Sequence, residues 1–292
     1  MSYFSYFVLF LFGLAAGSFL NVVSLRFQPG QRLLDLRIIN GRSRCPHCQK
    51  TLRWYELIPL LSFIVQSGRC RSCGSRLSFQ YPLVEFLSGL IFILVPYLLT
   101  LIPYFLNSKF YIPVIAVWIL IFLLFLLLSV VDFRFYLIPD QINLLLAISG
   151  FILIIFKSMG QWSIVGSQRS FLGHYSLLFG LIENVWLNHF FAMALAMIFF
   201  AAIIILSRGK GMGWGDFKLA AAFGLIFGWP DIIVVIFLAF VIGAVFTAPL
   251  LIKKQKTMKD VVPFGPFLVI GSSLVFFLGK QLIDGYFKLF NF

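Results

Sequence analysis

Long apolar segments alternate with short polar ones along almost the whole chain. A helix needs roughly 20 mainly apolar residues to cross a bilayer. Seven segments approach or reach that length, and an eighth is shorter. They lie near 4–25, 83–106, 111–131, 137–156, 189–206, 231–252 and 262–280, with the short one near 217–229. The pattern predicts an all-α polytopic membrane protein with about eight transmembrane helices.

Composition agrees with this pattern and excludes an ordinary soluble protein. Apolar residues make up 61% of the chain and charged residues 11%, with a mean hydropathy of +1.01. Soluble domains are nearer half apolar and a quarter charged. No basic residue precedes the first apolar segment, and the first charge is Arg26. We therefore expect that segment to be a retained span and not a cleaved signal peptide.

The basic residues predict an orientation. Lys and Arg number 23 against 10 Asp and Glu, a net charge of +13. If residue 1 lies outside, 18 of the 23 fall in the inner segments 26–80, 132–136, 207–218 and 253–260, as the positive-inside rule requires. This count needs the short segment to cross, which places both termini outside. In so apolar a chain, the excess charge indicates anionic membrane lipid as the partner, and not nucleic acid.

Four cysteines lie in the polar segment 26–80, in two Cys-x-x-Cys pairs separated by 21 residues. Two such turns can complete a tetrahedral zinc shell. A disulfide is less consistent with a reducing cytosol, and a redox role is disfavoured because two pairs occur without a thioredoxin-like pattern. We expect a small cytoplasmic zinc-ribbon-like insertion with structural zinc, and His47 could replace a ligand. The expected ligands are Cys45, Cys48, Cys70 and Cys73.

Two aspartates are predicted to lie at the same inner face of the membrane. Asp132 ends the third apolar segment, and Asp216 follows the glycine-rich stretch 211–215. Two carboxylates held close together share a proton, so one can activate water while the other polarises a peptide carbonyl. Alternatively, either aspartate caps a helix or pairs with Arg134 or Lys218. The pair indicates an aspartyl protease.

Other candidates for the chemistry are weaker. Asp140 is the rival for the first position, but it follows Pro139 and opens the next apolar segment, where a capping aspartate is expected. No His-Glu-x-x-His or Gly-x-Ser-x-Gly motif is present. The histidines lie away from the predicted inner face. These observations leave the two aspartates as the candidate catalytic pair.

The ordered motifs resemble those of the bifunctional type IV prepilin peptidases. They are Gly-Ser-Phe-Leu-Asn at 17–21, the two cysteine pairs, Tyr-Pro-Leu-Val-Glu at 81–85, Asp132 with Ile-Pro-Asp at 138–140, and Gly-x-Gly-Asp-x-Lys at 213–218. The resemblance spans residues 13 to about 270. It implies cleavage of the basic leader of prepilins or pseudopilins, followed by methylation of the new N-terminus with S-adenosylmethionine. Carried over by motif, the catalytic residues are Asp132 and Asp216.

The resemblance also implies a division of the chain. Residues 1–25 are the first span, 26–80 the four-cysteine domain associated with methyl transfer, 81–131 spans 2 and 3, and 132–292 the peptidase core. The loop 157–188, longer than is usual in the family, is expected outside. The protein is placed in the bacterial inner membrane with both active sites facing the cytoplasm. The motif residues proposed for the methylation site are Gly17, Asn21, Glu56, Gly68 and Glu85.

Three other readings remain open from the residues. Gly17 and Asn21 could only pack helices, and Glu85 could only pair with a loop arginine. The whole chain could instead be a transporter or channel whose aspartates bind cations and whose zinc domain is a gate. A peptidase without methyl transfer is a third reading, against which the cysteine domain argues.

Overall fold

The computed structural model describes residues 3–31, 33, 38, 40–101, 110–159, 184–209, 211–253 and 262–289. The chain divides into two compact units, residues 1–99 and 100–292. The boundary falls between two helices that the sequence analysis placed together in segment 81–131. Every named element among the described residues is helical, and the only strand-like pairings are two isolated bridges.

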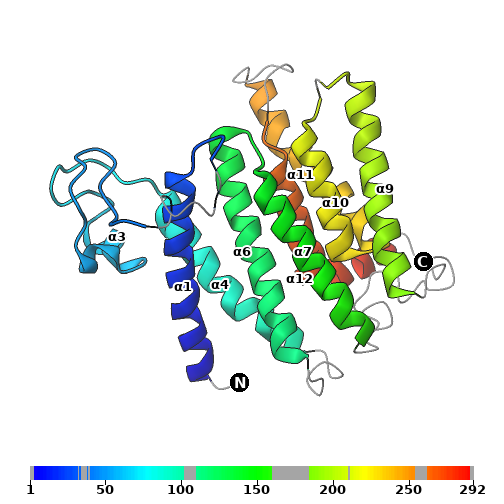
Figure 1. The fold of residues 1–292 in the computed structure, drawn as a ribbon, viewed down its shortest axis with the longest axis horizontal. Coiled ribbons are helices and arrows are strands. Elements are labelled where there is room, and N and C mark those ends of the chain that lie inside the picture. The colour runs from blue at the N-terminus through cyan, green and yellow to red at the C-terminus, as the bar shows by residue number, and fades with distance from the viewer. Residues whose placement is uncertain are drawn as a thin grey trace. The chain divides into compact units, whose positions relative to one another are not determined.

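The first unit holds two long helices and the cysteine domain (Figure 1). Helix α1 spans Tyr3–Arg26 and α4 spans Gln80–Thr100. The helices pack closely where Gly13 of α1 faces Gly89 of α4, since a Cβ on Gly13 would lie 2.7 Å from the Cα of Gly89. Between the two helices the chain forms a short 3-10 helix, η1 (Trp54–Leu57), and a one-turn helix, α3 (Leu61–Val65).

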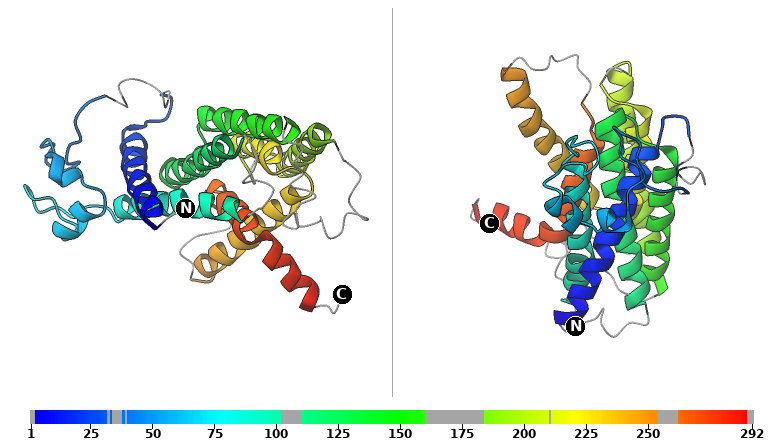
Figure 2. Two further views of the ribbon diagram at one scale, coloured as in Figure 1. Left: turned by 90° about the horizontal axis from the view of Figure 1, so that it is seen from below. Right: turned by 90° about the vertical axis from the view of Figure 1, so that its left-hand side faces the viewer.

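The second unit is a bundle of six helices among its described residues. They are α6 (Tyr111–Phe135), α7 (Asp140–Met159), α9 (Val185–Leu206), α10 (Trp214–Phe227), α11 (Asp231–Ile252) and α12 (Gly265–Leu289). Helix α10 packs against α7, α9 and α11, and α12 packs against α6 and α11. Figure 2 shows α11 and α12 on one side of the layer that contains α6 and α7.

Aromatic rings connect α10 to α6 through the centre of this bundle. The Phe125 and Phe223 rings stack with centroids 4.8 Å apart, and those of Trp118 and Phe227 lie 6.1 Å apart. Residue numbers fall along α6 as they rise along α10, so the two helices are antiparallel. Eight of the 14 residues of α10 are buried, which makes this short helix the core of the unit.

A polar contact is buried in the same bundle, near the C-terminal end of α7. Lys157, two residues before the end of α7, places Nζ 3.0 Å from Nε2 of His189 in α9. Nδ1 of His189 lies 2.8 Å from the carbonyl oxygen of Leu225 in α10. Because a carbonyl only accepts, Nδ1 donates, and in the neutral ring Nε2 accepts from the lysine. The contact therefore joins three helices.

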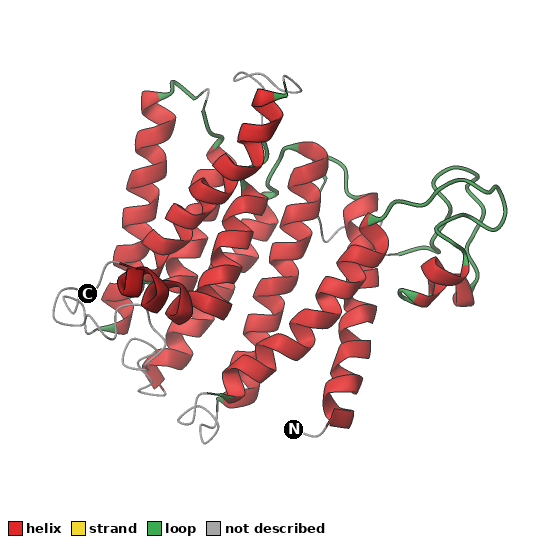
Figure 3. Ribbon diagram, turned by 180° about the vertical axis from the view of Figure 1, so that it is seen from behind, coloured by secondary structure: helices red, strands yellow, loops and turns green. Residues whose placement is uncertain are grey.

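The predicted apolar segments all form helices, as Figure 3 shows from behind. Six of them are long and apolar enough to cross a membrane. Helix α10 has 14 residues, and the apolar part of α12 covers Gly265–Gly279. The prediction of an all-helical membrane protein is confirmed, whereas the exact number of spans stays a prediction. The loop predicted at 157–188 lies outside the described residues over 160–183.

Candidate active site and metal centre

Asp132 lies near the C-terminal end of α6, where the helix stops at a left-handed residue. The cap residue Tyr136 has φ 53°, and its N–H donates to the carbonyl oxygen of Asp132. The side chain of Asp132 is only 3% exposed. Its Oδ2 accepts a hydrogen bond of 3.0 Å from the N–H of Gly265, the first residue of α12. A carboxylate is thus held inside the bundle by a backbone donor.

Asp216 lies in the first turn of α10. The N-cap is Gly213, whose N–H donates to Oδ2 of Asp216 over 3.2 Å. This is the capping contact that was considered as an alternative role for this aspartate. It occupies one oxygen only and leaves Asp216 half-buried. A Cβ on Gly215 would lie 3.3 Å from Cβ of Ile138, so the glycine lets the start of α10 approach the segment that follows α6.

The antiparallel packing of α6 and α10 puts the two aspartates at one end of the bundle. Asp132 follows Phe125 by seven residues, and Asp216 precedes Phe223 by seven residues. Seven residues make about two turns, so each carboxylate lies about 10.5 Å along its helix from the stacked rings. The structure thus brings together two residues that are 84 positions apart.

Asp140 takes a different position. It is the first residue of α7, and its side chain is 73% exposed in an ion pair of 2.8 Å with Nζ of Lys218. Lys218, the alternative partner considered for Asp216, therefore binds Asp140. The guanidinium of Arg134 lies over the ring of its neighbour Phe135, 4.9 Å from the centroid. This arrangement keeps Asp140 in an exposed ion pair at the surface.

Gly265 is a site residue that sequence reasoning missed. Besides its hydrogen bond to Asp132, a Cβ built on it would lie 2.7 Å from Oδ2 of Asp132 and 2.9 Å from Cδ2 of Leu128. The sequence does indicate that a helix begins at Gly265. The residue lies between Phe264 and Pro266 at the start of an apolar segment, and proline is common in the first turn of a helix.

The two cysteine pairs form matching turns. The N–H of Cys45 donates to the carbonyl of Lys50, and that of Cys70 donates to the carbonyl of Ser75. Each turn is closed by an isolated bridge, Arg44 to Thr51 in one and Arg69 to Arg76 in the other. The turns repeat after 25 residues, and both carry the pattern Arg-Cys-x-x-Cys-x-x-x-Leu. No internal repeat was predicted from the sequence, although this pattern is visible in it.

The four cysteine sulfurs fit a single metal ion. All four lie within 4.8 Å of one another, and the Sγ atoms of Cys45 and Cys73 are 3.9 Å apart. Sulfurs at 2.3 Å from a tetrahedral zinc would be about 3.8 Å apart. The hydroxyl and the backbone N–H of Ser75 lower the pKa of Cys73 to about 6, which favours the thiolate that metals bind. The cluster consists of cysteines alone and does not include His47.

We expect the purified protein to contain one zinc ion per chain. Cys73→Ser should reduce the metal content several-fold because it removes one of four ligands. His47→Ala should keep the full amount and serves as the matched control from the same turn. Elemental analysis by mass spectrometry measures both. Metal-free wild-type protein, or loss of metal in His47→Ala, would contradict this assignment.

Three of the residues proposed for methyl transfer meet between α1 and α4. A Cβ on Gly17 would lie 2.7 Å from Cα of Glu85, so the glycine permits close packing of the helices. Nδ2 of Asn21 donates to the carbonyl of Tyr81 over 3.0 Å, while its Oδ1 is buried and has no hydrogen-bond partner among the described residues. Oε2 of Glu85 accepts from the N–H of Leu60 over 2.8 Å. Glu85 therefore binds a loop backbone, and no arginine among the described residues forms an ion pair with it.

The other two proposed residues make local contacts in the cysteine domain. Oε2 of Glu56 accepts from the N–H of Arg53 over 2.7 Å and so caps η1. Gly68 has φ +65°, a conformation that favours glycine, and its N–H donates to the carbonyl of Phe63. Leu60 has φ 59°, which is uncommon for a residue with a side chain. Its contact with Glu85 fixes this conformation.

Each of the two units matches a known protein family. Residues 11–99 match the bacterial peptidase A24 N-terminal domain, and residues 118–248 match the type IV leader peptidase family. The prepilin leader peptidase/N-methyltransferase of Bacillus subtilis (strain 168) is 31% identical over 282 residues, covering 97% of this chain and 98% of that protein. Proteins of the same name from Aeromonas hydrophila (31% over 306 residues, 97% and 93%) and Legionella pneumophila (29% over 305 residues, 97% and 95%) are similar. No solved structure matches the chain significantly.

Proposed function

This chain belongs to the prepilin leader peptidase/N-methyltransferase family, and from that premise we propose which of its residues perform each reaction. The protein cleaves prepilin leaders and methylates the N-terminus that cleavage exposes. We assign proteolysis to Asp132 and Asp216. The observation that carries this assignment is their placement at one end of the bundle, each about two helical turns from the stacked rings of Phe125 and Phe223.

The two carboxylates would share one proton, so that one acts as a base and the other as a hydrogen-bond donor. The ionised member takes a proton from water, and the resulting hydroxide adds to the scissile carbonyl carbon. The same proton is then given to the amide nitrogen as the C–N bond breaks. The protonated member donates a hydrogen bond to the carbonyl oxygen and stabilises the charge that develops on it. The N–H groups of Gly265 and Gly213 hold one oxygen of each carboxylate. Each aspartate therefore keeps a second oxygen for water or substrate.

We assign methyl transfer to the first unit. S-adenosylmethionine would supply an activated methyl group, and Oδ1 of Asn21, an acceptor with no partner among the described residues, fits a donor such as its amino group. Glu85 presents a carboxylate 7% exposed between helix and loop. That carboxylate would hold the positively charged amine of the cleaved pilin or take its proton. Gly17 shapes the contact, whereas Glu56 and Gly68 support the loop that reaches Glu85.

We place both sites at the cytoplasmic face of the bacterial inner membrane, with a prepilin or pseudopilin helix as substrate. The distribution of Lys and Arg supports this orientation. A prepilin has an apolar helix with a basic leader on the inner side, so a carboxylate pair at the membrane boundary meets the junction without moving the leader. The four cysteines would bind structural zinc, since a closed set of thiolates leaves no position for substrate.

Digestion of a prepilin, followed by mass spectrometry of the products, tests which residues carry cleavage and which carry methylation. Wild-type protein should remove the leader from a prepilin, and the mature product should gain one methyl group only when S-adenosylmethionine is added. Glu85→Gln keeps an acceptor for Leu60 but loses the charge, so methylation should fall by roughly tenfold or more while cleavage continues. Glu56→Gln is the matched control, because Glu56 caps η1. Unchanged methylation in Glu85→Gln would remove Glu85 from the reaction.

A further inference from the structure

The segment from η1 to α3 carries apolar side chains on its outer surface. Trp54 is 78% exposed, and Ile64 and Val65 are each 69% exposed. Together with Leu57, Ile58 and Leu61, these residues form what we call the apolar edge of the cysteine domain. The edge lies outside the long apolar helices, so crossing the membrane does not explain it. Helices η1 and α3 contact each other, and exposed apolar side chains gathered on neighbouring turns point to an interaction site.

The apolar edge lies at a definite level relative to α4. The N–H of Leu60, the residue before α3, donates to Glu85 in the second turn of α4. Helix α4 is a candidate span of 21 residues, only slightly longer than a bilayer requires. Glu85 is five residues past its start, about 7.5 Å along the axis at 1.5 Å per residue. The edge is therefore level with the first turns of a membrane span and not beyond its end.

The figures agree with this position of the apolar edge along the helices of the first unit. Figures 1 and 3 show the cysteine domain beside α1, with α3 level with the C-terminal half of α1. Interfacial helices bury their apolar face about 5–10 Å into the boundary between headgroups and acyl chains. The length of about 7.5 Å between the start of α4 and Glu85 is of the same size as that depth.

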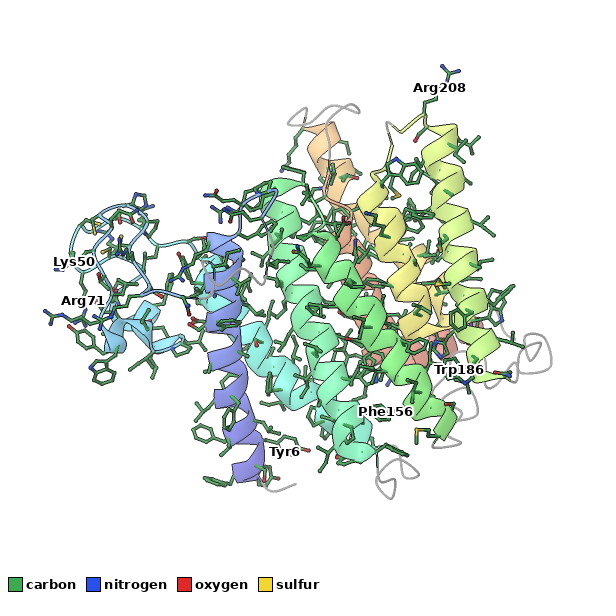
Figure 4. All side chains as sticks on the ribbon, in the orientation of Figure 1. Tyr6, Lys50, Arg71, Phe156, Trp186 and Arg208 are labelled. Atoms are coloured by element: carbon green, nitrogen blue, oxygen red, sulfur yellow. The ribbon has the colours of Figure 1, made fainter. Side chains whose placement is uncertain are left out.

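The charge of the residues around the apolar edge indicates which kind of lipid it contacts. Residues 40–79 contain seven Lys and Arg residues and a single acidic residue, Glu56, which is bound to the N–H of Arg53. Figure 4 labels Lys50 and Arg71 at the side of the domain away from α1. Basic residues beside apolar and aromatic ones are typical of segments that lie on anionic membrane surfaces.

We propose that the apolar edge inserts into the anionic lipid of the leaflet from which α4 begins. The cysteine domain is then a monotopic element that rests in the membrane interface and not a soluble domain on a linker. Insertion holds Leu60 against Glu85, so lipid contact positions the loop next to the residues assigned to methyl transfer. This goes beyond the proposed function, because it concerns the membrane partner and would hold for either reaction.

A fluorescent amino acid placed at Ile64 of the full-length protein tests the insertion. Reconstituted in vesicles of brominated anionic phospholipid, the probe should lose at least about half of its emission. The same probe at His47, exposed in the first cysteine turn, is the control and should keep its emission. Equal emission at the two positions would overturn the proposal. Quenching at Ile64 that is the same in purely zwitterionic vesicles would overturn the assignment to anionic lipid.

A second measurement separates lipid from a protein partner. A photo-reactive residue at Ile64 should cross-link to phospholipid in vesicles that contain no other protein. Leu61→Ser with Val65→Ser should reduce this cross-linking several-fold, while zinc content stays at the wild-type value because the cysteine turns are untouched. Cross-linking at Ile64 in cell membranes to a protein alone would identify an apolar protein partner and overturn the lipid assignment.

Discussion

Asp132→Asn and Asp216→Asn should each abolish prepilin cleavage. An amide neither takes a proton from water nor shares one with the other carboxylate, so kcat/KM should fall by roughly a thousandfold or more, within the range for acid–base groups. Cleavage of a prepilin in vesicles, followed by mass spectrometry, measures the loss. Methylation of a substrate that has already been cleaved should continue in both variants, because it is assigned to the first unit.

Asp140→Asn is the matched control for these substitutions. It removes a carboxylate at the start of α7 that is exposed and paired with Lys218. Exposed ion pairs contribute little to stability, so activity should stay within about threefold of wild type. Loss of cleavage in Asp140→Asn with retention in Asp132→Asn would reverse the assignment. Retention of cleavage in Asp216→Asn would remove Asp216 from the proteolytic pair.

Gly265→Ala should have the second largest effect on cleavage. The added methyl group would lie 2.7 Å from Oδ2 of Asp132, closer than such contacts occur. Either the carboxylate moves or the start of α12 shifts, and the 3.0 Å hydrogen bond from Gly265 is lost. Misplacing a catalytic group by about 1 Å can cost a hundredfold in rate. Cleavage kinetics should therefore show a fall in kcat of roughly tenfold to a hundredfold.

Gly279→Ala provides the control on the same helix. Among the described residues, a Cβ there would meet only Cγ1 of Val275, at an ordinary 3.8 Å. Both variants add one methyl group to α12, so a difference between them reports the site near Asp132 and not the helix itself. Equal activity of Gly265→Ala and wild type would show that this backbone contact does not position Asp132.

The helices and the cysteine cluster could be predicted because their signals are local. An apolar run of the right length forms a helix in a membrane whatever its neighbours do, and two Cys-x-x-Cys turns need only each other. The meeting of Asp132 with Asp216 was inferred from an expected common depth. What brings them together is the antiparallel stacking of Phe125 on Phe223, which no local pattern encodes.

Contacts made by the backbone were the hardest to foresee. Gly265 binds Asp132 through its N–H, and Leu60 binds Glu85 in the same way. Side-chain chemistry does not reveal such donors, because every residue except proline carries one. The capping of η1 by Glu56 was also missed, since a motif position had suggested a role in methyl transfer. In each case, tertiary packing decided the partner.

The contact between Lys157 and His189 sets an order for building the bundle in the membrane. Synthesis delivers α7 before α9 and α10, so the ammonium group of Lys157 first has neither His189 nor the Leu225 carbonyl near it. A lone charge near a helix end stays among the lipid headgroups. Only when the later helices arrive can it turn inward to the ring nitrogen. We therefore expect α7 to reach its final burial only after its partners have entered the bilayer.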